Sequence, residues 1–316
     1  MTCSKIDFAS LVLSRMANPA DLVLPIAETS QAAAIGRIIL RQLKPNSAPG
    51  GDYALRMSAL GKCARALAYD IAGVVKDGRK IDGRSRLTFA MGDMAEALLT
   101  QALNEALVAN PELGWQLKSI QSATGQEGVT LQVDDWELPG HPDGVIGHPD
   151  VGSIVLEVKS TSSYGFSKWQ QAIADGVDPW SPDEGYYWQL QGYIHAMDCQ
   201  LGYVLALCKD SGAICGWWVE RDPGFLARLR PHLEEATSGP SRARRVLPGG
   251  STLQPVEKLS KRTGDPLKGH GLLPWQCRYC SHYRTCYGDN LDERVERDYR
   301  GRPSTGLYLR AQGGEG

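Results

Sequence analysis

The sequence predicts a mixed α/β fold in which a small central sheet is flanked by helices. Two observations lead to this prediction. Residues 153–160 and 201–222 carry apolar side chains in the pattern of strands, whereas 58–73, 86–107 and 223–236 carry them at helical spacing. The two kinds of segment follow one another as helices, strands, helices, a strand pair and a helix, and that order is typical of a mixed core.

The expected elements divide the chain into three parts. Residues 1–50 are predicted to form a helical extension with breaks at Pro25 and Pro45, and 51–290 to form the main domain. Within that domain we expect helices at 58–73 and 86–107, strands at 131–147 and 153–160, helices at 162–174 and 184–197, a hairpin at 201–222 turning at 210–212, and a helix at 223–236. The polar, glycine-rich tail 291–316 is predicted to be disordered.

Composition narrows the classes of protein to consider. With 42% hydrophobic and 22% charged residues, the chain is typical of globular proteins. The net charge of -2 means that nucleic-acid binding would require local concentrations of positive charge. No apolar run approaches the roughly 18–20 residues of a membrane helix, and the N-terminus lacks a signal-peptide layout, so we expect a cytoplasmic protein that does not associate with membranes.

The word Gly-His-Pro-Asp occurs twice, at 140–143 and 147–150. The repeat could form a symmetric metal site or two turns. Alternatively, one copy could carry a catalytic carboxylate while the other copy recurs by chance. Turn-forming residues after position 147 predict a hairpin centred on Asp150, about 23 Å along the strand from Glu157. Asp150 and His148 are therefore expected to be turn residues, and His141 is not expected to have a direct role.

The hairpin centre also predicts which residues face one another. Paired positions sum to 300, so Asp143 faces Glu157 with Cβ atoms about 5 Å apart, and Lys159 lies on the same face. Two like charges at that distance repel unless a divalent cation lies between them. A Mg²⁺ or Mn²⁺ ion with an adjacent lysine fits metal-assisted phosphodiester hydrolysis. The Glu157–Lys159 pair alone would also fit a solvent-facing ion pair on an edge strand.

These residues, together with Gln189-Leu-Gln-Gly-Tyr193, resemble the PD-(D/E)XK nuclease superfamily and its RecB-like branch, which carries a Q-x-x-x-Y motif on the next helix. The resemblance implies a restriction-endonuclease-like core and DNA exonuclease activity. The catalytic residues implied by it are Asp143, Glu157, Lys159, Gln189 and Tyr193. The implied metal ligands are Asp143, Glu157, the carbonyl of Val158 and Glu96, where many relatives have a histidine in place of Glu96.

Four cysteines carry a second resemblance. Cys277-x2-Cys280-x5-Cys286 can converge on a soft metal centre, and Cys63 is the best candidate for a fourth ligand. One early cysteine with this late spacing is similar to the CRISPR-associated RecB-like iron–sulfur exonucleases and the AddB nuclease domain. That likeness implies a [4Fe–4S] cluster that joins the C-terminal segment to the N-terminal helix. Zinc is the alternative, although four-cysteine zinc sites usually consist of two close C-x2-C pairs.

The expected partner is DNA that is single-stranded or has free ends. The candidate DNA-binding residues are Arg242, Arg244, Arg245, Lys261 and Arg262. Five aromatic residues near Gln189 are mostly expected in the core, with one or two available for base stacking: Trp169, Trp180, Tyr186, Tyr187 and Trp188. Recombination, repair, phage DNA metabolism or CRISPR adaptation would supply a recombinase, a helicase or an adaptation protein as partner. The alternatives are a phage alkaline-type double-strand exonuclease, a restriction-type endonuclease, and a non-catalytic DNA-binding metal-cluster module.

Overall fold

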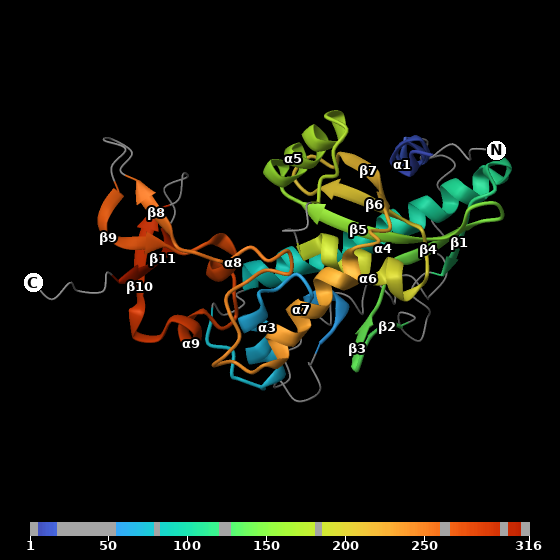
Figure 1. The fold of residues 1–316 in the computed structure, drawn as a ribbon. Helices are drawn as coiled ribbons and strands as arrows, with labels where there is room; N and C mark the ends of the chain where they lie inside the picture. Colours follow the sequence, from blue (N-terminus) through green and yellow to red (C-terminus); the bar gives the residue numbers. More distant parts are fainter. Residues whose placement is uncertain are drawn as a thin grey trace, which may run out of the picture. The chain divides into compact units, whose positions relative to one another are not determined.

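The computed structural model describes residues 6–17, 55–78, 83–119, 128–180, 185–259, 266–297 and 303–310. The chain divides into two compact units (Figure 1). Unit 1 comprises residues 1–60 and 81–226, and unit 2 comprises 61–80 and 227–316. This division differs from the predicted one, because the segment around Cys63 belongs with the C-terminal part of the chain. No described helix combines the length and apolar character of a membrane span.

Unit 1 is built on a five-stranded sheet. In spatial order its strands are β1 (Gln116–Ser119), β4 (Gly144–His148), β5 (Gly152–Thr161), β6 (Leu201–Cys208) and β7 (Ile214–Glu220). The β5–β6 pair is parallel and the other pairs are antiparallel, so the sheet is mixed. Together with its flanking helices, this sheet confirms the predicted fold class.

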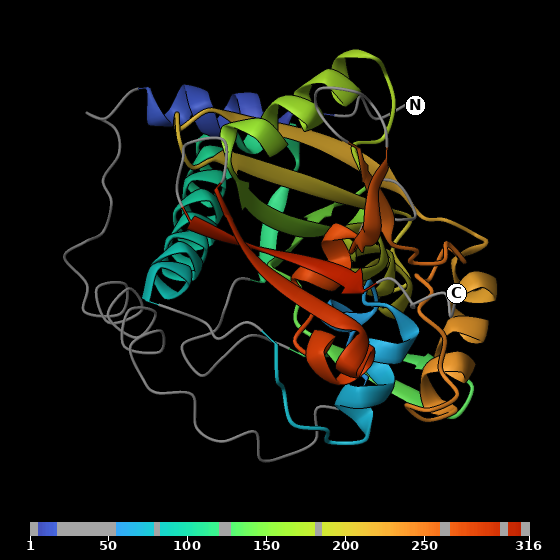
Figure 2. The same cartoon turned by 90° about the vertical axis from the view of Figure 1, so that its left-hand side faces the viewer.

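The helices of unit 1 lie on both sides of this sheet. They are α1 (Phe8–Met16), α4 (Gly83–Ala109), α5 (Ser163–Ala174) and α6 (Gly185–Ala196), with short 3-10 turns at Met57–Ala59 and Pro111–Leu113. Figures 1 and 2 both show α4 alongside the sheet with α1 next to it. On the other side, the missing side chain of Gly202 lets Leu190 and Ile194 of α6 approach β6 closely.

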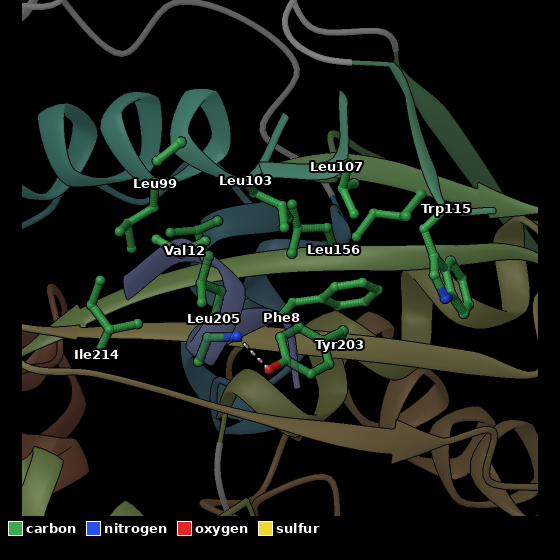
Figure 3. Packing of buried hydrophobic residues seen from close by; sticks show 14 of the residues in the cluster. Phe8, Val12, Leu99, Leu103, Leu107, Trp115, Leu156, Tyr203, Leu205 and Ile214 are labelled. Atoms are coloured by element: carbon green, nitrogen blue, oxygen red, sulfur yellow. Dashed lines mark hydrogen bonds between the residues drawn. The ribbon is translucent and has the colours of Figure 1, made fainter. Parts of the chain in front are cut away.

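The main core lies between the sheet and helices α1 and α4 (Figure 3). Leu99, Leu103 and Leu107 recur every four residues, so α4 presents one apolar stripe to the sheet. On the sheet, alternate residues of β5 belong to the same core cluster, namely Ile154, Leu156 and Val158. The intervening residues of β5, Glu157 and Lys159 among them, therefore point to the opposite face, which α6 covers.

The segment 131–147 differs from the single strand that the sequence predicted. It contributes to three strands, β2 (Val129–Val133), β3 (Trp136–Gly140) and β4, of which β2 and β3 form a separate hairpin. Asp134 has a φ of 49° in the tight turn between β2 and β3. Aspartate tolerates this left-handed conformation, which reverses the chain direction within two residues.

Unit 2 contains a second sheet and the cysteine-rich segment. Its elements are α3 (Ala64–Ile71), the later part of α7 (Phe225–Thr237), β8 (Val256–Leu259), β9 (Pro266–Leu272), α8 (Trp275–Arg278), α9 (Tyr283–Tyr287), a 3-10 turn at Gly288–Asn290, β10 (Leu291–Arg297) and β11 (Pro303–Arg310). The strand order is β10-β11-β9-β8. Strands β10 and β11 lie in the tail that was predicted to be disordered. Seven antiparallel residue pairs join the two strands, and this pairing satisfies backbone hydrogen-bonding groups. Helix α3 begins after Cys63 and not at Ser58 as expected.

Candidate functional site

The β4–β5 hairpin has the register that the sequence predicted. Gly144 pairs with Leu156, and the pairing continues without a shift to His148 and Gly152 at the turn. Asp143 directly precedes β4 and therefore lies opposite Glu157. Its Oδ2 accepts a hydrogen bond of 2.7 Å from the backbone N–H of Val158. This bond holds the Asp143 carboxylate against β5.

Glu157 and Lys159 form the centre of the candidate active site. The Glu157 side chain is fully buried, and its Oε1 accepts a hydrogen bond from the Lys159 ammonium group, whose side chain is 17% exposed. The second oxygen of Glu157, Oε2, is buried without a hydrogen-bond partner among the described residues. An unsatisfied buried carboxylate oxygen is costly, and it calls for a cation or a proton.

The electrostatics of these three side chains also favour a cation. Burial, and next the charge of Asp143, raise the pKa of Glu157 to about 8. Burial likewise raises the pKa of Asp143. Burial alone would lower the pKa of Lys159, but Glu157 and Asp143 outweigh it and the net shift is upward. The lysine remains charged beside two carboxylates that burial disfavours in their ionised form.

Gln189 and Tyr193 lie on one face of α6, as their spacing predicts. The Gln189 Nε2 donates to the Tyr193 hydroxyl at 3.2 Å. The Tyr193 ring packs against the Gly140 backbone, where an added Cβ atom would stand 2.6 Å from its Cε1. Burial, followed by the charge of Glu157, raises the pKa of Tyr193 to about 12, so the hydroxyl keeps its proton. Tyr193 is therefore tied to both the β3–β4 connection and the carboxylates.

Glu96 has a looser relation to the site. Gly92, one turn earlier on α4, faces the Ser160 hydroxyl, to which an added Cβ atom would stand at 3.5 Å. The charge of Glu96 contributes to the raised pKa of Glu157, so the two carboxylates are near enough to interact. Its role as a metal ligand stays a prediction.

The donor set fits a hard divalent cation. Oxygen ligands from one or two carboxylates, completed by water and substrate, are what Mg²⁺ requires. Asp143 and Glu157 supply the two carboxylates, and the unpaired Oε2 of Glu157 supplies a free oxygen. In the described part of the chain, no three His, Cys, Asp or Glu side chains are already arranged to hold a metal ion. Two carboxylates with a backbone carbonyl would need no such triplet.

The second Gly-His-Pro-Asp word, at 147–150, forms the turn of the β4–β5 hairpin. His148 packs against Trp115 with ring centroids 4.7 Å apart. Its Nδ1 accepts the backbone N–H of Asp150 at 3.1 Å, which stabilises the turn. His141 is exposed. The turn role expected for Asp150 and His148 is confirmed by these contacts.

Of the five aromatic residues singled out near Gln189, one combines exposure with proximity to the site. Tyr186 is 43% exposed, and the Lys159 Nζ lies 5.2 Å from its ring centroid. Its ring packs on the buried Trp180 at 5.3 Å. Tyr187 and Trp188 are buried, whereas Trp169 is partly buried against Trp180.

The basic residues predicted to bind DNA have varied surroundings. Arg242 is exposed. Arg244 binds Glu235 through both its backbone N–H and its side chain. Arg245 is half-buried and binds Cys286, as described below. Lys261 and Arg262 lie outside the described residues.

The four predicted ligand cysteines gather in unit 2. Cys277 is part of the apolar cluster of unit 2, and Cys63, Cys280 and Cys286 pack against that cluster. Burial, with a smaller contribution from neighbouring thiolates, raises the pKa values of Cys63, Cys277 and Cys280 to about 11. Cysteines that raise one another's pKa lie close together. Among the described residues, however, no three of them are already arranged as the ligands of a metal ion.

Each of the four sulfur atoms also accepts a hydrogen bond. The donors are the backbone N–H of Ala66 for Cys63, the Tyr287 hydroxyl for Cys277 at 3.3 Å, the backbone N–H of His282 for Cys280 at 3.4 Å, and the Arg245 Nε for Cys286 at 3.2 Å. Hydrogen bonds to sulfur favour the thiolate, the form that binds metals. No local sequence pattern pointed to the side-chain donors, because 41 residues separate Arg245 from Cys286.

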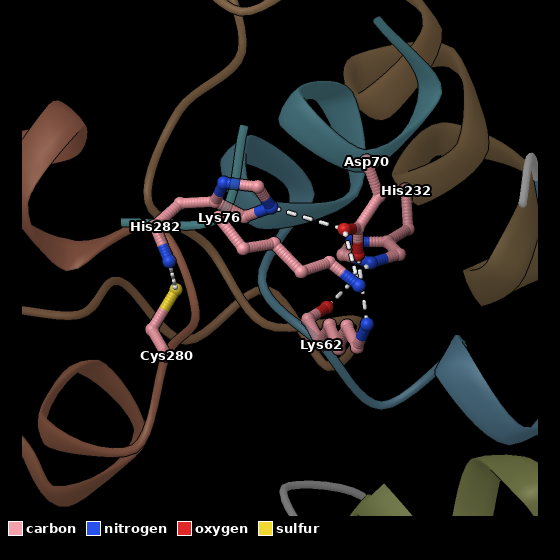
Figure 4. Close-up of polar contacts among 6 residues, drawn as sticks. All are labelled: Lys62, Asp70, Lys76, His232, Cys280 and His282. Carbon is pink, nitrogen blue, oxygen red and sulfur yellow. Dashed lines mark hydrogen bonds and ion pairs between the residues drawn. The ribbon is translucent and has the colours of Figure 1, made fainter. Parts of the chain in front are cut away.

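Polar contacts tie α3 to the cysteine segment (Figure 4). Asp70 forms ion pairs with Lys62 and Lys76 and accepts from His282 Nε2 at 3.0 Å. Burial would raise the pKa of Asp70, but the hydrogen bonds from His282 and Lys62 outweigh it and hold the pKa well below its usual range. The carboxylate thus stays ionised and anchors the loop that carries Cys280.

Comparisons with known proteins give a distant structural likeness. No protein-family model matches the chain, and neither does any curated protein. The fold is similar to a structure titled "Crystal structure of SSO0001", with 15% identity, a TM-score of 0.42, and coverage of 82% of this chain and 96% of that one. An alkaline exonuclease from Laribacter hongkongensis has 16% identity and a TM-score of 0.32, with 57% and 88% covered. A phage-related exonuclease from Haemophilus somnus 129PT has 16% identity and a TM-score of 0.34, with 60% and 93% covered.

Proposed function

We propose that the protein is a metal-dependent deoxyribonuclease that digests DNA from its ends. The observation that carries this proposal is the buried arrangement of Asp143 opposite Glu157, with one Glu157 oxygen unpaired and Lys159 beside it. A simple ion pair would not need a second, partly buried carboxylate at that position. A divalent cation would satisfy both carboxylates, and the lysine would lie next to it.

Each residue has a distinct part in the proposed reaction. Asp143, Glu157 and the carbonyl of Val158 would hold Mg²⁺ or Mn²⁺, which lowers the pKa of a bound water and offsets phosphate charge. Lys159 would orient the attacking water and stabilise the negative charge that develops on the phosphate. The protonated Tyr193 hydroxyl, positioned by Gln189, would donate a hydrogen bond at the edge of the site.

We further propose that Cys63, Cys277, Cys280 and Cys286 hold a [4Fe–4S] cluster. One buried and three partly buried cysteines, whose sulfurs each accept a hydrogen bond, fit a thiolate-bound metal centre, because a bound metal offsets the charges of neighbouring thiolates. Zinc is the alternative occupant of the same four thiolates. A cluster would hold together segments that lie more than 200 residues apart in the sequence.

The nuclease proposal predicts Mg²⁺-dependent degradation of end-labelled linear DNA by the purified protein. Chelation of the divalent ion should abolish it, and a closed circular substrate should survive if digestion needs an end. Degradation of the circle at the same rate would identify an endonuclease instead. If single-stranded and double-stranded DNA are bound but neither is degraded, the protein is a non-catalytic DNA-binding module.

The position of Tyr186 predicts that the protein prefers DNA with unpaired nucleotides as its substrate. Its partly exposed ring lies beside Lys159, so a base attached to the bound phosphate could stack on it. Stacking on one aromatic side chain contributes roughly 1–3 kcal/mol, so Tyr186→Ala should raise KM for single-stranded DNA roughly 5- to 150-fold. Tyr186→Phe, which keeps the ring, serves as the control. An oligonucleotide lacking its terminal base should lose the difference between the two variants; a difference that persists would argue against stacking.

A further inference from the structure

One short segment of unit 2 connects the distant parts of the cysteine site. The backbone carbonyls of Val246 and Arg244 accept the N–H groups of Ala64 and Arg65, at 2.9 and 3.1 Å. The first N–H groups of a helix have no partner inside the helix, so this segment caps the start of α3. Cys63 is the residue from which that helix starts. The segment around residues 243–247 is thereby fixed next to the first cysteine.

The side chain of Arg245 extends from this segment to the last cysteine. Its Nε donates to the Cys286 Sγ at 3.2 Å, and its Nη2 donates to the Cys286 carbonyl at 2.7 Å. The guanidinium carbon lies 4.2 Å from the centroid of the Tyr287 ring. The Tyr287 hydroxyl in turn donates to the Cys277 Sγ at 3.3 Å. One arginine thus supports two of the four sulfurs, one directly and one through the ring that it covers.

We propose that Arg245 is a positioning residue of the cysteine metal centre, which holds Cys286 and, through Tyr287, Cys277 in place for the metal. This inference rests on the proposed occupation of that centre. It assigns Arg245 a task other than the DNA contact that its basic neighbourhood suggested. Two of its guanidinium nitrogens donate hydrogen bonds to Cys286, and the guanidinium group lies over the ring of Tyr287.

The chemistry of arginine suits this position. The guanidinium group keeps its charge, forms directed hydrogen bonds in a fixed fork, and stacks on aromatic faces, whereas a lysine ammonium group is a point charge. A charged donor on a metal-bound thiolate stabilises the negative sulfur and orients it toward the metal. Loss of such an outer partner typically lowers metal affinity about 10- to 100-fold.

The test compares metal release from the intact purified protein. Wild type, Arg245→Gln, Arg245→Lys and Tyr287→Phe are prepared anaerobically, and the release of iron or zinc to a chromogenic chelator is followed with time. Arg245→Gln should release metal about 10- to 100-fold faster than wild type. Arg245→Lys should fall between them, and Tyr287→Phe should accelerate release while the ring and the arginine remain. The matched control is Arg244→Gln, which removes the same charge from the adjacent residue but no bond to sulfur.

The outcomes separate this inference from the proposal on which it rests. Metal-loaded wild type with equal release rates in Arg245→Gln and Arg244→Gln overturns the role of Arg245 alone. Should Arg245→Gln fail to fold by circular dichroism, the Tyr287→Phe rate decides, and an unchanged rate overturns the inference. Wild type that contains neither iron nor zinc after anaerobic purification overturns the metal centre and the role of Arg245 together.

Discussion

Replacing Lys159 with alanine is expected to reduce Mg²⁺-dependent DNA hydrolysis about 10²- to 10³-fold, the typical loss when one preorganised stabilising donor is removed from an active site. The reason lies in its position, since its ammonium group is the cation that contacts Glu157 beside the proposed metal site. The effect should appear in kcat, because the lysine acts on charge that develops during the reaction. Initial rates on end-labelled DNA at saturating substrate measure it.

Two controls separate loss of chemistry from loss of fold. Lys118→Ala removes an exposed lysine from the same sheet and should keep the wild-type rate. Glu157→Gln preserves the shape of the buried carboxylate but removes its charge, so it should abolish activity with less disturbance of the core. A folded Lys159→Ala protein that degrades DNA at the wild-type rate would show that the lysine has no part in catalysis.

The carboxylate pair could be predicted because only local rules are involved. Side chains alternate along a strand, and the turn at Asp150 sets the register, so the arithmetic that placed Asp143 opposite Glu157 needed nothing from the rest of the fold. The same holds for Gln189 and Tyr193, which four residues of helix bring together. In both cases the residues concerned are close in sequence or joined by one short turn.

Contacts between distant segments were beyond such rules. The spacing of the late cysteines pointed to a metal centre, but nothing in the residues near Arg245 distinguished it from Arg242 or Arg244 as a contact for DNA. Only the tertiary fold brings its guanidinium group to Cys286 and its neighbour Tyr287. The strands β10 and β11 escaped detection for a related reason. Their polar sequence resembles a disordered tail, but backbone pairing and the burial of Leu291, Leu307 and Tyr308 stabilise them.

Replacing Cys63 with serine is expected to empty the cysteine centre and remove the stability that its metal provides. Of the four cysteines proposed as ligands, Cys63 alone comes from the N-terminal segment of unit 2, so its loss leaves three thiols from one short segment. Iron and sulfide content, together with absorbance near 400 nm, should fall to background. Cys215→Ser in unit 1 is the matched control and should retain both.

The stability of wild type and that of Cys63→Ser should respond differently to metal removal. A metal that binds only the folded chain contributes about 2.7 kcal/mol when its concentration exceeds Kd by 100-fold, and more when binding is tighter. Chelation should therefore lower the unfolding midpoint of wild type, whereas Cys63→Ser should start low and stay unchanged. The apoprotein need not collapse, because burial raises the pKa of the Cys277 and Cys280 thiols to about 11 and they remain neutral without metal. Equal responses of both proteins to the chelator would exclude Cys63 from the metal centre.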